Sequence, residues 1–79
     1  MPDKAMAKRR LAQADRRIAE SEQRLAEQRE IAEALAAGGH NDAAVRAAAL
    51  ARTMQHTLDI MREHRQLILR ELAAEEPAG

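Results

Sequence analysis

The sequence contains no cysteine and no aromatic residue. Without cysteine, the chain can form neither a disulfide framework nor a cysteine-based zinc site. Without Phe, Trp or Tyr, it lacks the stacking platforms that usually hold the bases of single-stranded nucleic acid. Several common classes of site are therefore excluded before any pattern of residues is considered.

The chain also lacks net charge and long apolar runs. Lys and Arg together number 13, as do Asp and Glu, so no general attraction to nucleic acid or to a membrane surface is expected. No apolar run approaches the roughly 20 residues that span a bilayer, and the first residues lack the apolar core of a signal peptide. A length of 79 residues fits one small domain. We expect a soluble, cytoplasmic protein with no membrane association.

Glycine and proline are rare, and their positions divide the chain into two helices. Between residues 3 and 37 there is neither, and Ala, Arg, Glu, Gln, Leu and Lys, all strong helix formers, fill most of the segment. Gly38 is expected to end this helix in a left-handed conformation, and Asn41 or Asp42 to cap the next one. The expected elements are a first helix at about 3–37, a turn at 38–42, a second helix at about 42–75, and a frayed tail at 76–79.

The apolar positions on either side of the turn mirror each other. Residues whose numbers add to 79 form matched pairs, among them Leu25 with Met54, Ile18 with Met61 and Leu11 with Ile68. Both segments follow a heptad repeat, in which position a begins at Lys4 in the first segment and at Ala44 in the second, and position d at Ala7 and Ala47. Most of the a and d positions hold apolar or small residues. We therefore expect an all-α fold, a long antiparallel two-helix hairpin with coiled-coil-like packing along this seam of a and d positions.

Two seam positions are polar, and the register suggests how they are accommodated. Gln28 would face Ala51, and Arg65 would face Ala14, so the small partners leave room for the long side chains to reach water. Asp15 follows Ala14 and is the expected ion-pair partner of Arg65. Polar residues of this kind fix the register of a helix pair at some cost in stability.

The second helix carries a further apolar stripe that the seam does not use. Its members recur every three or four residues: Leu50, Thr53, Thr57, Ile60, His64 and Leu67. The first helix cannot cover both stripes, and a lone hairpin has only one thin contact layer. We expect a homodimer, most simply an antiparallel four-helix bundle, with an interface formed by Leu50, Thr57, Ile60, His64 and Leu67. A monomer with scattered exposed aliphatic residues, or an unidentified protein partner, are the alternatives.

The first half of the first helix is basic. The residues that could contact a nucleic-acid backbone are Lys8, Arg9, Arg10, Arg16 and Arg17. The plasmid copy-number protein Rop, a dimeric helical hairpin, holds RNA on a basic helical face, but this analogy concerns architecture only. Acids of the second helix, including Glu63 and Glu71, are expected to lie nearby and offset much of the charge. An ordinary solvated face is therefore the preferred interpretation.

The sequence offers no set of catalytic, cofactor-binding or metal-binding residues. It has no Gly-rich phosphate loop and no plausible Ser–His pair, and a two-helix hairpin provides no obvious pocket. His56 and His64 are eight residues apart, which is too far for one metal ion. We expect no enzymatic activity, no cofactor and no metal site.

Several segments resemble a group of short uncharacterised bacterial helical-hairpin proteins. The resemblance rests on residues 18–24, 28–31, 39–40, 64–65 and 70–72, and it covers roughly residues 11 to 72. The group has an "IAEGER-x-IA-x-QR" first helix, a "GHDT" turn and an "H-x-x-(H/D)R-x-x-L-x-x-EL" second helix. This chain has Ser21 where the group tends to Gly, and Asn41 before its Asp. The resemblance implies a stand-alone bacterial hairpin and no particular activity.

Together, these patterns favour a non-enzymatic structural or protein–protein interaction module that associates with itself through its second helix. The alternative function is a small nucleic-acid-binding protein that uses the basic first half of the first helix.

Overall fold

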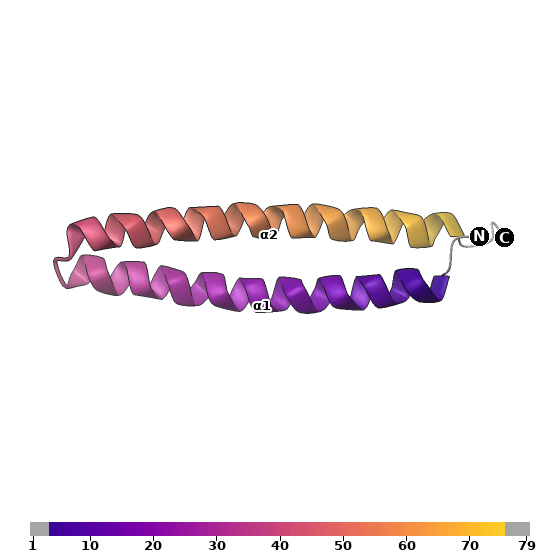
Figure 1. The fold of residues 1–79 in the computed structure, drawn as a ribbon, viewed down its shortest axis with the longest axis horizontal. Coiled ribbons are helices and arrows are strands. Elements are labelled where there is room, and N and C mark those ends of the chain that lie inside the picture. The colour runs from indigo at the N-terminus through magenta and orange to yellow at the C-terminus, as the bar shows by residue number, and fades with distance from the viewer. Residues whose placement is uncertain (1–3, 76–79) are drawn as a thin grey trace.

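The computed structural model describes residues 4–75, which form two antiparallel helices lying side by side along their whole length (Figure 1). Helix α1 spans Lys4–Ala37 and helix α2 spans Asn41–Glu75. The chain measures 61 × 19 × 15 Å, so it is a rod one layer thick. The predicted all-α hairpin is confirmed for the described residues. The predicted tail at 76–79 and the predicted first helical residue, Asp3, lie outside them.

The turn between the helices is shorter than predicted, and a different glycine from the predicted one adopts its left-handed conformation. The backbone N–H of Gly39 donates to Ala36 O at 3.1 Å, and that of His40 donates to Leu35 O at 2.9 Å. This pair of hydrogen bonds closes helix α1 in a Schellman motif, which requires a left-handed residue at Gly39. Gly39 has φ 79°, so the expectation that Gly38 takes this role was wrong.

Helix α2 begins one residue earlier than expected, at Asn41. The carbonyl of His40 accepts the first intrahelical hydrogen bond, from Ala44 N–H at 2.8 Å, which places His40 at the N-cap. Neither Asn41 nor Asp42 donates or accepts a side-chain hydrogen bond among the described residues. The expected side-chain cap is therefore wrong, although Asp42 still places a negative charge in the first turn of the helix.

The core is the seam between the helices. Every buried residue described falls at an a or d position of the predicted heptads; they are Ala7, Ile18, Leu25, Ala47, Ala51, Leu58 and Ile68. Leu58 and Ile68 are the most enclosed, with 2% and 1% of their surface exposed. Met54 and Met61 are partly buried and pack against the cluster around Leu58. The seam predicted from the mirrored positions is thus the core of the molecule.

Polar groups in the seam fix how the two helices are aligned. Arg65 Nε donates to Asp15 Oδ1, which is the predicted ion pair. Gln28 Nε2 donates to Ala47 O at 3.1 Å, so its side chain crosses the seam to the backbone of α2 instead of reaching only toward water. Ser21 Oγ donates to Met61 Sδ at 3.4 Å, so this hydroxyl also bridges the two helices.

The apolar content of the helices is modest. Over residues 4–75, neither helix has a stretch apolar enough to cross a lipid bilayer. Three of the seven buried residues in the described part of the chain are alanines, which allow the backbones to approach but contribute little buried area. A single layer of this kind is at the lower limit of what holds a domain of this size together.

Candidate interface

The two long sides of the hairpin differ in chemistry. In an antiparallel pair, the e positions of the two helices lie near each other on one side of the seam, and the g positions lie near each other on the opposite side. The e side carries polar bridges between α1 and α2. The g side carries most of the exposed aliphatic residues. We call these the polar face and the aliphatic face.

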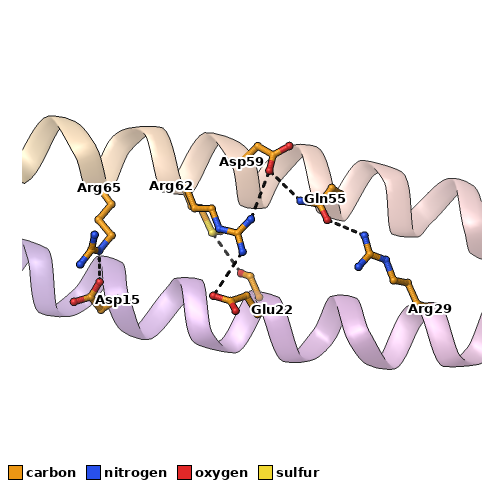
Figure 2. A network of polar contacts seen from close by, with 9 residues as sticks. Asp15, Glu22, Arg29, Gln55, Asp59, Arg62 and Arg65 are labelled. Carbon is orange, nitrogen blue, oxygen red and sulfur yellow. Dashed lines mark hydrogen bonds and ion pairs between the residues drawn. The ribbon is translucent and has the colours of Figure 1, made fainter.

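The polar face is covered by a network of side chains that joins α1 to α2 (Figure 2). Arg29 Nη2 donates to Gln55 Oε1 at 2.8 Å, and Gln55 Nε2 donates to Asp59 Oδ1 at 2.9 Å. Arg62 forms two ion pairs: its Nη2 lies 3.8 Å from Glu22 Oε1, and its Nη1 lies 3.8 Å from Asp59 Oδ1. The charged side chains of this network are about half exposed, so each ion pair contributes at most about 1 kcal/mol. The network satisfies these charges within one chain and leaves little for a partner to recognise.

The aliphatic face lies on the opposite side of the seam and includes the stripe predicted on the second helix. Leu50, Ile60 and Leu67 each leave 51% of their surface exposed. Thr53 Oγ1 donates to Ala49 O at 3.3 Å, and Thr57 Oγ1 donates to Thr53 O at 3.2 Å. Because these hydroxyl groups are already bonded within the helix, covering the two threonines would leave no hydroxyl unsatisfied. The stripe is therefore less costly to bury than its composition suggests.

Helix α1 adds to the aliphatic face in a way that the single-helix pattern missed. Ile31 and Met6 are about half exposed and lie at the g and c positions of α1, on the same side as the stripe. Among residues 4–75, five of the six exposed large aliphatic residues thus share one face, and the exception is Val45. The signal was present in the sequence, because g positions of both helices in an antiparallel hairpin lie on one side.

A shallow groove runs along the aliphatic face between the helices. It has a volume of about 280 Å³ and is lined by Arg10, Gln13, Ala14, Arg17, Ile60, Met61, His64 and Ile68. The floor is aliphatic, whereas the rim carries two arginines and a histidine. His64 is exposed on this rim, and it makes no hydrogen bond with any described residue.

The basic residues predicted as nucleic-acid contacts are all exposed, but they do not share one face. Lys8 lies on the polar side of α1, Arg9 and Arg16 lie on its outer edge, and Arg10 and Arg17 line the groove. Arg10 Nη1 pairs with Glu71 Oε2 at 3.0 Å, which is one of the expected charge offsets. The other four form no ion pair among residues 4–75, so the offset is smaller than expected.

No cluster of three or more His, Cys, Asp or Glu residues that could hold a metal ion occurs within the described part of the chain. His56 and His64 are exposed on α2, and each is accompanied by fewer acids than a metal site requires. We therefore describe the aliphatic face, with its basic rim, as the candidate functional surface.

Comparison with known proteins gives no match: no protein-family profile, curated protein or solved structure is similar to this chain. The function must therefore be argued from the geometry of the hairpin itself.

Proposed function

We propose that this protein is a non-enzymatic interaction module that associates with itself through the aliphatic face, forming a four-helix bundle with coiled-coil-like packing. The observation that carries the proposal is the exposure of Leu50, Ile60 and Leu67 on one side of α2, continued by Ile31 on α1. Burying the exposed half of each such side chain would contribute roughly 1 kcal/mol.

The total surface of the hairpin supports the same proposal. The chain exposes 5990 Å², whereas a compact monomer of its 8.8 kDa mass exposes about 4800 Å². The excess of about 1200 Å² is larger than the roughly 800 Å² that each partner buries in a standard interface. A second layer of helices that forms one standard interface would therefore remove about two-thirds of this excess.

Sedimentation equilibrium at micromolar concentration tests self-association. We expect a mass near twice the 8.8 kDa of the chain. The matched variants are Leu50→Glu, which places a charge on the aliphatic face, and Val45→Glu, which places one on an exposed aliphatic residue of the other side. The first should give the monomer mass and the second the dimer mass. A wild-type mass of 8.8 kDa at high micromolar concentration would refute the proposal.

A second candidate function is favoured by one observation. Arg9, Arg16 and Arg17 are exposed and form no ion pair among the described residues, so they are available to phosphate groups. Titration with duplex DNA and hairpin RNA at two salt concentrations tests this. Binding that weakens steeply with salt, and that is lost in Arg9→Glu/Arg16→Glu, would favour nucleic-acid binding, while no binding at low salt removes it.

A further inference from the structure

The aliphatic face of α2 is complementary to itself when one copy is read in reverse. The outward g and c positions pair when their numbers add to 117, as Leu50 with Leu67, Thr57 with Ile60, Thr53 with His64 and Arg46 with Glu71. Leucine meets leucine, a small side chain meets a larger one, and a cation meets an anion. A two-fold symmetric interface needs this property, because residue i of one copy contacts residue j of the other, and j contacts i.

Helix α1 shows a second palindrome on the same face. Its g and c positions pair when their numbers add to 44, and two of the four pairs, Arg24 with Glu20 and Arg17 with Glu27, join opposite charges. These four side chains are exposed, and neither Arg17 nor Arg24 forms an ion pair with any residue described in its own chain. Two copies of α1 lying antiparallel would therefore bring opposite charges together at four places.

The two palindromes have one common centre. The centre on α2 lies between Leu58 and Asp59, and the centre on α1 lies at Glu22. Across the seam, side-chain bonds join residues whose numbers add to between 75, for Gln28 with Ala47, and 84, for Arg29 with Gln55. Glu22 is therefore level with α2 near Leu58 and Asp59. Because the seam already matches the heptads of the two helices, pairing of g with c positions on α1 and on α2 shares one level in every heptad register, and the residues that meet decide among these registers.

We propose that the aliphatic face binds the same face of a second copy, with α2 on the partner's α2 and α1 on the partner's α1. The two-fold axis is perpendicular to the helices and passes level with Glu22. The turns at Gly39 then lie at opposite ends, and every neighbouring pair of helices is antiparallel. This arrangement rests on the proposed self-association and specifies its surface, orientation and register.

Other arrangements on this face match the residues of α2 less well, although one of them keeps opposite charges together on α1. Sliding the two copies by one heptad in one direction places His64 against the partner's Arg46, and sliding in the other places Leu50 against the partner's Ala74. Laying α1 on the partner's α2 places Arg17 and Arg24 against the aliphatic stripe instead of the acids of α1. Burying a charge against aliphatic groups without a partner is costly.

Cysteine cross-linking tests the arrangement, because the chain has no cysteine of its own. Thr53→Cys and His64→Cys are prepared as separate proteins, mixed and exposed to a mild oxidant. The thiol introduced at position 53 of one copy would meet the thiol introduced at position 64 of the other. Two thiols at position 53 would instead lie about 16 Å apart, beyond the reach of a disulfide. We expect the mixture to cross-link at least tenfold faster than either variant alone.

The matched control is a mixture of Arg52→Cys and Gln66→Cys. These exposed positions lie at similar distances from the proposed axis, but on the polar side of α2. Cross-linking of the control mixture alone would overturn the proposed face while leaving self-association intact. A sedimentation mass of a dimer without cross-linking of either mixture would overturn the register. A monomer mass for the unmodified chain would overturn both this inference and the proposed function.

A charge exchange provides a second, independent measurement. Arg17→Glu and Glu27→Arg should each raise the dimer dissociation constant about tenfold, because each creates like-charge pairs at two places. The double variant Arg17→Glu/Glu27→Arg should restore it to within about threefold of the wild-type value. A double variant as weak as the product of the two single effects would overturn the pairing.

Discussion

Arg65 of α2 donates a hydrogen bond to Asp15 of α1, so a cation at a seam position meets an acid fifty residues away in the sequence. The Arg65 side chain is about one-third exposed and the Asp15 side chain about half exposed, so the pair is only partly shielded from water. Its main effect is on alignment, because a shift of either helix by one turn would separate the two groups.

Replacing this arginine should stabilise the hairpin and weaken its alignment. We expect Arg65→Leu to raise the free energy of unfolding by about 1 kcal/mol, because an aliphatic side chain packs into the seam better than a partly buried ion pair. Urea unfolding measures the change. The control is Arg62→Leu, an arginine on the polar face, which should change the unfolding free energy by less than about 0.5 kcal/mol. Destabilisation by Arg65→Leu would contradict the prediction.

The two glycines of the turn should differ in their response to alanine. Gly39 has φ 79°, a conformation that costs an L-residue about 1–2 kcal/mol. At Gly38 a Cβ atom would meet only the His40 ring at 3.2 Å and Ala34 O at 3.4 Å, and the ring can move. We expect Gly39→Ala to lower the melting temperature by about 4–16 °C and Gly38→Ala to change it by less than half as much. Equal shifts would show that the left-handed residue is not essential to the turn.

Substitutions at two leucines of α2 should separate the effect on folding of the hairpin from the effect on its self-association. Leu58 is 2% exposed and Leu50 is 51% exposed. We expect Leu58→Ala to cost about 2–5 kcal/mol of unfolding free energy, enough to remove much of the helical circular dichroism. Leu50→Ala should leave the spectrum of the dilute chain unchanged but raise the dimer dissociation constant severalfold. Loss of helicity in Leu50→Ala at low concentration would show that Leu50 supports the hairpin itself.

Association through the aliphatic face should not tolerate a fixed positive charge at position 64. His64 lines the groove with Arg10 and Arg17, and Glu71 is paired with Arg10. The ammonium group introduced by His64→Lys would add a positive charge beside two arginines and would need to be desolvated against the partner's Thr53. We expect His64→Lys to raise the dimer dissociation constant about tenfold in sedimentation equilibrium. The uncharged variant His64→Gln should change it less, and an equal rise in both variants would exclude the charge as the cause.

Much of the fold could be predicted because it depends on local composition and on the mirrored apolar positions of the two helices. The lack of Gly and Pro over residues 4–37 predicts an uninterrupted helix, and the mirrored Ile18, Leu25 and Leu58 predict the seam that forms the core. The Asp15–Arg65 pair followed from the same register. These features depend on 3.5-residue spacing, which is fully visible in a sequence.

The turn could not be predicted in detail, because Gly38 and Gly39 are equally able to adopt a positive φ. Which of them does so depends on where the last hydrogen bonds of α1 close, and those bonds end at Ala36 O and Leu35 O. The full aliphatic face was missed for a related reason. Ile31 belongs to a different helix from the stripe, and one-helix patterns do not show which residues of two helices share a side.

The sequence by itself therefore determined two helices, their antiparallel seam and the exposed stripe on the second helix, because helical periodicity encodes each of these. Only the tertiary structure decided that Gly39 ends α1 and that most of the polar bridges gather on the side away from Leu50. These depend on the rotation and alignment of one helix against the other. That alignment is set by contacts such as Arg65 with Asp15, between residues far apart in the chain.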